Sequence, residues 1–274
     1  MQWSKVFAIA KKDWLEVRQN RFAWMPMLIL PILISIVLPL VTTVGLPLLN
    51  VNAQASLLAD PDIADFLKLM PESMQQFIFD ENPVSGMITI VLGYMMAPFF
   101  LIMPLMVSTI IAAESFAGER ERKTVEALLY LPVSDFELFL GKAAAAAIPA
   151  LGLTWASFIL YALIVNIMPY AYFQRIWFPL PTWWPLVLWI TPGLVLLGIS
   201  FTMLISARVK SFMGVYQMSS ILVIGVVALF VGQVTGVLYL SVAMGLAVGG
   251  LIWGAAIIML AVAVKMFNRT ALLT

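Results

Sequence analysis

The sequence predicts an all-α polytopic membrane protein with six transmembrane helices, an N-terminal amphipathic interfacial helix and a short cytoplasmic helix between spans 2 and 3. Two properties predict this fold. The chain is 63% hydrophobic and 11% charged, whereas a soluble domain is about one quarter charged. It also contains long uncharged runs, and about 20 apolar residues are enough for a helix to cross a bilayer. The runs are residues 22–59, 82–113, 143–174, 176–207 and 211–264.

The first expected element is an amphipathic helix over residues 3–21. Apolar residues recur there at steps of three and four, so they share one face of a helix. They are Trp3, Phe7, Ala10, Trp14 and Val17. Lys, Asp, Glu and Arg side chains occupy the other face. A basic helix with tryptophan on its apolar side lies in the membrane interface, where its simplest role is to anchor the first span.

Each of the first four uncharged runs holds one span, and the last run is long enough for two. The spans are expected at about 24–49, 86–111, 143–168, 185–206, 213–232 and 238–263. Residues 50–85 form an external segment with two short helices. The first begins at Asp60-Pro61, because aspartate caps a helix and proline suits its first position; the second begins at Pro71. Aromatic residues beside spans 3 and 4 predict a belt at the outer headgroups. They are Tyr170, Tyr172, Trp177, Trp183 and Trp184.

The distribution of basic residues predicts the orientation, because lysine and arginine concentrate on the cytoplasmic side of a membrane. Six spans place both termini on one side. That side carries thirteen of the fifteen basic residues, and only Lys68 and Arg175 lie opposite. Both termini and the charged connection between spans 2 and 3 are therefore expected in the cytoplasm.

The sequence predicts no catalytic, cofactor-binding or metal site in this chain. It has no cysteine and no histidine, which removes the commonest nucleophiles and metal ligands. Its one Gly-Lys pair, Gly141-Lys142, has Phe136 where a phosphate-binding loop needs glycine and Ala143 where it needs serine or threonine. The uncharged runs also lack an acid for proton coupling. If the chain takes part in pumping, the energy comes from another polypeptide.

Residues 114–126 are a dense charged block, with seven charges in thirteen residues. Glu119 precedes Lys123 by four residues, the favourable order for a helical ion pair, and Pro132 ends the helix. Ser134 and Glu137 then have the spacing of a capping box that opens the next helix toward span 3. A short, stiff amphipathic helix is expected here. From the residues alone it is either a solvated interfacial helix or a docking site for a cytoplasmic partner.

A family resemblance is carried by the stretch "AGERERKTVEALLYLPVSDFELFLGK". It resembles the cytoplasmic signature of the membrane subunits (permeases) of type-2 ATP-binding-cassette (ABC) exporters. The family pattern is E-x-x-x-G-E-[RK]-E-x-x-T-x-E-x-L-L-x-x-P-[VIL]-S, followed by a Gly-Lys pair. The matching residues are Glu114, Gly118, Glu119, Arg120, Glu121, Thr124, Glu126, Leu128, Leu129, Pro132, Ser134, Gly141 and Lys142. The N-terminal helix and the six spans extend the resemblance over essentially the whole chain.

The resemblance implies that residues 114–142 are the coupling region, and that the helix at 114–131 docks on a separate nucleotide-binding (ATPase) subunit. The residues implied in coupling are Glu114, Gly118, Glu119, Arg120, Glu121, Arg122, Thr124, Glu126, Leu128, Leu129 and Pro132. Residues 3–21 would be the elbow helix, which approaches the same subunit. Its implied residues are Trp3, Phe7, Lys11, Lys12, Asp13 and Trp14. Two permease chains, identical or different, would work with two ATPase chains that bind ATP and Mg²⁺.

Other expectations concern substrate, location and the competing function. The resemblance implies the cell membrane of a bacterium or archaeon and no nucleic-acid partner. A path between spans without charges would be lined by Met, aromatic, Ser and Thr side chains, which favours a hydrophobic or amphipathic substrate such as a lipid, drug or peptide. The alternative is a stand-alone channel, scramblase or membrane assembly factor whose charged helix binds another cytoplasmic partner.

Overall fold

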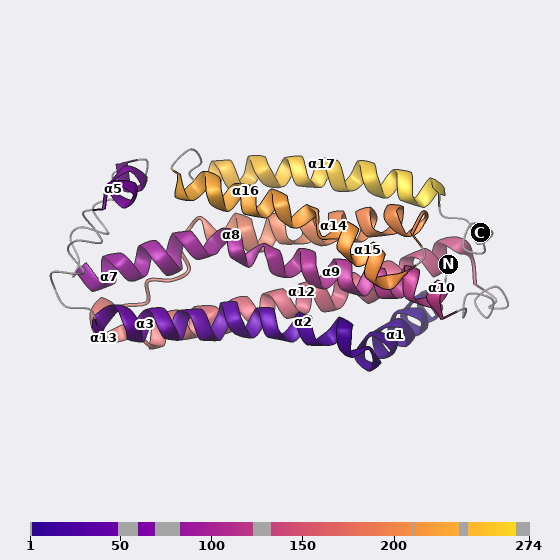
Figure 1. Ribbon diagram of the computed structural model, residues 1–274, viewed down its shortest axis with the longest axis horizontal. Helices are drawn as coiled ribbons and strands as arrows, with labels where there is room; N and C mark the ends of the chain where they lie inside the picture. Colours follow the sequence, from indigo (N-terminus) through magenta and orange to yellow (C-terminus); the bar gives the residue numbers. More distant parts are fainter. Residues whose placement is uncertain are drawn as a thin grey trace.

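The computed structural model describes residues 2–48, 60–68, 83–122, 133–209, 211–235 and 241–266. Within them the chain is an elongated bundle of helices that run roughly along one axis (Figure 1). Six helices are long and apolar enough to cross a membrane, and none of the described residues is in a strand. The spans are Ala23–Leu48, Val84–Glu121, Asp135–Ile167, Pro185–Ser206, Phe212–Gln233 and Val242–Lys265. The chain is therefore an all-α polytopic membrane protein, as predicted.

The first helix, α1 (Trp3–Gln19), ends at Asn20, where the backbone is extended, and the first span begins directly afterwards. Span 1 is α2 (Arg21–Ile32), η1 (Leu33–Val37) and α3 (Leu38–Leu48). Span 2 is α7 (Pro83–Ile88), η2 (Thr89–Met95), α8 (Met96–Phe100), α9 (Ile102–Ala113), η3 (Glu114–Gly118) and α10 (Glu119–Glu121). The η elements are π-helical turns.

The remaining spans are simpler. Span 3 is α12 (Asp135–Ile167), span 4 is η4 (Pro185–Ile190) and α14 (Thr191–Ser206), span 5 is α15 (Phe212–Ser219) and α16 (Leu222–Val234), and span 6 is α17 (Val242–Met266). The short helix α13 (Tyr170–Phe173) follows span 3. In the segment between spans 1 and 2, α5 (Pro61–Lys68) begins at the proline that predicts a helix start. The second helix expected there, from Pro71, lies outside the described residues.

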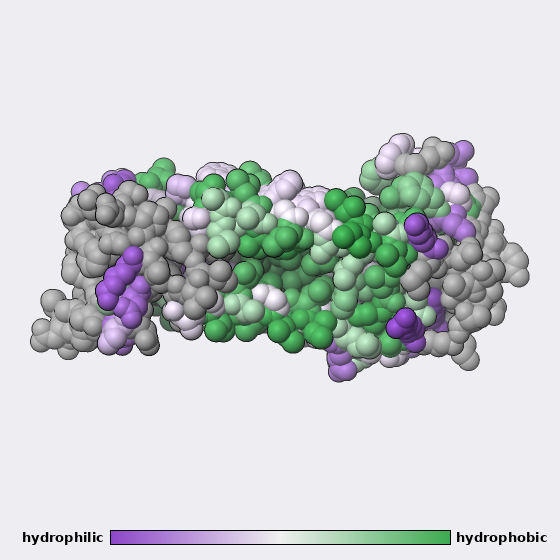
Figure 2. Space-filling model, turned by 90° about the horizontal axis from the view of Figure 1, so that it is seen from above, coloured by the Kyte–Doolittle hydropathy of each residue, from purple (hydrophilic) through white to green (hydrophobic). Residues whose placement is uncertain are grey.

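The two ends of the bundle differ from its middle. Figure 2 shows a central band of hydrophobic side chains, with hydrophilic ones toward both ends. Large apolar side chains are exposed on several spans, for example Ile29 (60%), Ile159 (60%) and Ile258 (67%). Such exposure suits hydrocarbon rather than water. The helices α1 and α10 and the end of α17 lie at one end of the bundle, and α5, α7 and α13 lie at the other (Figure 1).

The predicted aromatic belt is wrong for Trp183 and Trp177, and the π-helical turn η2 explains the first of these. A π-turn releases backbone carbonyls from the regular helix pattern, and within a membrane these need other donors. The carbonyls of Leu92, Gly93 and Tyr94 accept hydrogen bonds from Tyr161 Oη (2.6 Å), Trp183 Nε1 (2.6 Å) and Gln233 Nε2 (2.8 Å), respectively.

Trp183 is fully buried as a result. Trp177 is also buried, because its indole donates to the carbonyl of Val165 (2.9 Å). The other three expected belt residues, Tyr170, Tyr172 and Trp184, are exposed.

Candidate functional site: a buried charge network at one end of the bundle

The helix of span 2 is much longer than a bilayer requires. Val84–Glu121 contains 38 residues, which at 1.5 Å per residue is about 57 Å, against a hydrocarbon core of about 30 Å. Its charged end therefore extends beyond the hydrocarbon. Residues 114–121 continue this helix as η3 and α10, instead of belonging to the separate short helix that the sequence predicts. Residues 123–132 lie outside the described residues, so the structure says nothing of Thr124, Glu126, Leu128, Leu129 and Pro132.

The centre of the charged end is the ammonium group of Lys142, near the start of α12. Lys142 Nζ lies 2.6 Å from Glu119 Oε2 and 3.3 Å from Asp13 Oδ2. It also donates to the carbonyl of Ser115 at 2.6 Å, and the hydroxyl of Ser115 donates to Asp13. Lys142, Asp13 and Glu119 are each at most 2% exposed. One buried cation thus joins α1, the end of span 2 and the start of span 3.

A second layer of charges surrounds this centre. Lys12 pairs with Glu119 and lies 3.1 Å from Glu16 Oε1. Arg122 pairs with Glu114 and lies 3.0 Å from Glu16 Oε2. Burial would lower the pKa of Lys12, but the carboxylates of Glu119 and Asp13 outweigh it, so that its pKa is raised above the ordinary value and the group stays charged.

The two layers together form what we call the charge network: Lys12, Asp13, Glu16, Glu114, Ser115, Glu119, Arg122 and Lys142. It holds four carboxylates and three cations, one excess negative charge. Asn20 Nδ2, at the bend between α1 and span 1, donates to Glu114 Oε2 at 2.9 Å. The network therefore also reaches the beginning of span 1.

Gly141 is what allows α1 to approach α12 so closely. A Cβ atom at this position would lie 2.7 Å from Ile9 Cβ and 3.2 Å from the carbonyl of Val6. The start of α12 is fixed by the predicted capping box, which is confirmed. Ser134 Oγ accepts from the backbone N–H of Glu137 (3.2 Å), and Glu137 Oε2 accepts from that of Ser134 (2.9 Å).

The other carboxylate oxygen of Glu137 accepts from the backbone N–H of Gln2 at 2.7 Å. The starts of α1 and α12 are therefore tied to each other by a hydrogen bond as well as by the ion pairs.

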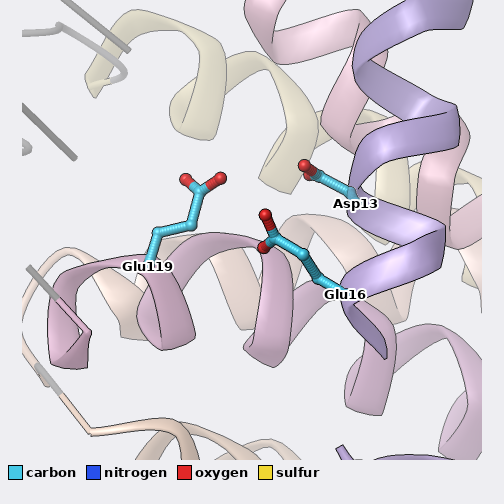
Figure 3. Close-up of side chains that lie close together, drawn as sticks. All are labelled: Asp13, Glu16 and Glu119. Carbon is cyan, nitrogen blue, oxygen red and sulfur yellow. The ribbon is translucent and has the colours of Figure 1, made fainter. Parts of the chain in front are cut away.

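Three carboxylates of the network, Asp13, Glu16 and Glu119, converge closely enough to suggest a cation site (Figure 3). The cation in contact with all three is the ammonium of Lys12, which pairs with Glu119 and lies 3.3 Å from Asp13 Oδ1 and 3.1 Å from Glu16 Oε1. The network balances most of its charge internally, so the convergence alone does not point to a metal.

Three more of the sequence-predicted residues, Gly118, Arg120 and Glu121, lie around the network. Arg120 donates to the carbonyl of Ser206 at the end of span 4. Glu121 Oε2 accepts from the backbone N–H of Phe212 (2.8 Å), at the start of span 5. Together with the buried ion pairs, these contacts link the end of span 2 to spans 1, 3, 4 and 5. Gly118 is buried against the carboxylate of Glu114.

The buried face of α1 differs from the apolar face expected from the sequence. It consists of Val6, Ile9, Ala10, Asp13 and Val17. Trp3 and Phe7 are 62% and 58% exposed, Lys11 is exposed, and Lys12 and Trp14 are partly buried. Asp13, expected on the polar face, is buried because Lys142 and Ser115 satisfy its carboxylate. Its spacing of four residues from both Ile9 and Val17 is the sequence signal that could have found it.

The bundle and its network define a class: a polytopic membrane protein whose charged side chains gather at the bundle ends and join several spans at one of them. Compared with known families, residues 7–273 match the model described as ABC-2 family transporter protein. The chain therefore belongs to the ABC-2 transporter family and is a membrane permease component of an ABC transporter. The comparisons find no matching curated protein and no matching solved structure.

Proposed function

We propose that this permease is the membrane part of an exporter driven by a separate ABC ATPase subunit, and that the charge network couples the two. The family supports an ATPase partner. The observation that carries the coupling proposal is the ammonium of Lys142, which is buried between Asp13 of α1 and Glu119 at the end of span 2. Because breaking a buried ion pair costs about 3–5 kcal/mol, these three elements move as one body.

In this proposal the buried and exposed charges have different roles. Glu114 and Glu119 are 1% and 2% exposed, so they hold the elements together within the chain. Glu121, Arg122 and Lys11 are exposed, and with residues 123–131 they form the surface that meets the ATPase. A displacement of that surface is transmitted to span 2 directly, to span 3 through Lys142, and to span 1 through Asn20.

The proposed orientation places the network end in the cytoplasm of a cell membrane, with both termini on that side. The excess of lysine and arginine at this end supports it. Two copies of the permease, or this chain and a related one, are proposed to enclose the substrate path. Because the uncharged runs of the spans hold no Asp, Glu, Lys or Arg side chain that would pair with an ion, we propose a hydrophobic or amphipathic substrate.

The coupling surface is tested by charge reversal. Glu126→Arg lies in the proposed docking segment, and the matched variant Asp65→Arg makes the same charge change on exposed α5 at the opposite end. We expect Glu126→Arg to remove most of the ATPase subunit that copurifies with the permease and to uncouple ATP hydrolysis from transport, while Asp65→Arg changes neither. If the two variants behave alike, the ATPase does not dock at this end.

The substrate class is tested separately, in inside-out membrane vesicles that contain the permease and its ATPase. We expect ATP-dependent accumulation of a fluorescent amphipathic dye, and no accumulation when a catalytic residue of the ATPase is substituted. ATP-dependent movement of sodium, without any movement of amphipathic dyes or labelled lipids, would contradict the proposed substrate class and leave the coupling proposal standing.

A further inference from the structure

A groove lies between α1, α2 and α12, next to the charge network but not part of it. Its volume is about 700 Å³, within the range of about 300–1,000 Å³ for small-molecule sites. Trp14 and Arg18 of α1 line one end, Trp24 and Met27 of α2 line one side, and residues 149–156 of α12 line the other. Except for Arg18 and the indole N–H groups, the lining side chains are apolar.

The groove has a direction relative to the membrane. The numbering of both α2 and α12 increases away from the network end, so Arg18 is at the end toward water. The part lined by Pro149 to Ala156 extends about 10 Å along α12, away from the network end. The adjacent surface of α2 is open to lipid, with Leu28 and Ile29 44% and 60% exposed. The groove therefore has a cationic end toward water, at Arg18, and an apolar part toward the middle of the membrane.

Three of the lining residues, Arg18, Trp14 and Trp24, carry polar groups. Among the described residues, Arg18 forms no ion pair, and the indole N–H groups of Trp14 and Trp24 form no hydrogen bond. Lys12, by contrast, is engaged in the charge network. An arginine and two tryptophans that line one groove at a membrane interface suit an anionic headgroup, because their N–H donors match its oxygen acceptors.

The floor of the groove is open at Gly152. A Cβ atom there would meet nothing within 4 Å, in contrast to Gly141 about three turns earlier, where α1 packs against α12. The helices α1 and α12 thus pack tightly at the charge network and separate beyond it. This separation leaves room for an acyl chain beside α12.

We propose that this groove binds one anionic phospholipid, with the phosphate on Arg18 and the two indole N–H groups and an acyl chain along Gly152. The lipid would fill the space between α1, span 1 and span 3 and would hold α1 in the membrane interface. The proposal does not rest on the transport function, since it concerns a structural ligand of this chain alone.

The test is native mass spectrometry of the purified full-length chain in detergent, titrated with phosphatidylglycerol or with phosphatidylcholine of the same acyl chains. For the wild type we expect one lipid to bind, phosphatidylglycerol about fivefold more tightly, the order expected for one arginine near an anionic surface. Arg18→Gln should remove this preference. Arg21→Gln, the same charge change outside the groove, should keep it.

A second pair of variants tests the channel. Gly152→Leu places its Cβ in open space and its side chain in the groove, and it should weaken both lipids. Gly45→Leu also places its Cβ in open space, but it lies outside the groove and should weaken neither. Ala156→Leu is a second filling variant if Gly152→Leu does not fold. Equal effects of Arg18→Gln and Arg21→Gln, or unchanged binding in both filling variants, would overturn the proposal. So would a filling variant that alters only the fraction of permease dimer, because a second chain would then occupy the groove.

Discussion

The substitution Lys142→Met removes the buried cation of the charge network while keeping an unbranched side chain that is only one atom shorter. Lys142 Nζ is bound by Glu119 Oε2 and the carbonyl of Ser115, both at 2.6 Å, and by Asp13 Oδ2 at 3.3 Å. Without it, the excess charge of the network rises from one to two negative charges. Leaving a buried ion without its partner costs about 3–5 kcal/mol. Because Lys12 still contacts both carboxylates, we expect the lower value, about 3 kcal/mol.

This loss is measurable as a change in melting temperature, followed by tryptophan fluorescence of the purified chain in mild detergent. For a protein of this size 1 kcal/mol corresponds to about 2–4 °C, so we expect Lys142→Met to melt about 6–12 °C lower. Lys11→Met is the matched control, since Lys11 is an exposed lysine of α1. Its effect should stay within about 0.5 kcal/mol.

A double-mutant cycle decides whether the loss comes from the ion pair. In Lys142→Met/Glu119→Gln the excess negative charge of the network returns to one. The double variant should therefore lose at least about 1 kcal/mol less free energy of unfolding than the two single variants lose together. A Lys142→Met variant that melts within 2 °C of the wild type would refute the reasoning. Strictly additive single effects would refute it as well.

Three further substitutions test other parts of the fold, each by the same melting assay. Gly141→Leu should lower the melting temperature and also abolish copurification of the ATPase, because its Cβ would lie 2.7 Å from Ile9 Cβ. Gly250→Leu, whose Cβ lies in open space, should do neither. Equal effects of the two variants would contradict the close contact of α1 and α12. Trp183→Phe removes the donor to the Gly93 carbonyl and should lower the free energy of unfolding by about 1–3 kcal/mol. Trp184→Phe, on the surface, should lower it less. A larger loss for Trp184→Phe would argue against the hydrogen bond from Trp183 to Gly93. Ser134→Ala should cost about 0.5–2 kcal/mol and Ser134→Asp much less; if both cost the same, the cap does not stabilise α12.

The spans were predictable because their cause is local: a helix that crosses hydrocarbon must be apolar over its whole length, and that composition is visible in the sequence. The capping box at Ser134 was predictable for the same reason, since both partners lie within one turn. Asp13 and Lys142 were not, because they are 129 residues apart and each alone resembles an ordinary interfacial charge. Only the approach of α1 to α12 at Gly141 brings them together.

The aromatic residues show the same limit. Tyr170 and Trp183 look alike in the sequence, as aromatic side chains between two spans. Trp183 is buried because the π-turn η2 releases the carbonyl of Gly93 at that depth, and the sequence of span 2 contains no sign of a π-turn that we could use. Where the hydrogen-bond partner of a side chain is distant in the sequence, the local sequence does not predict whether that side chain is buried or exposed.

The central claim is that an ABC ATPase subunit drives this permease from the network end. The most direct test is to purify the tagged chain from its native membranes in mild detergent, with and without crosslinking, and to identify the copurifying proteins by mass spectrometry. We expect an ABC ATPase in equal amount to the permease, with crosslinks to α1 and to residues 114–131. A permease that purifies without an ATPase even after crosslinking, or an ATPase crosslinked only to the end that carries α5, would contradict the claim.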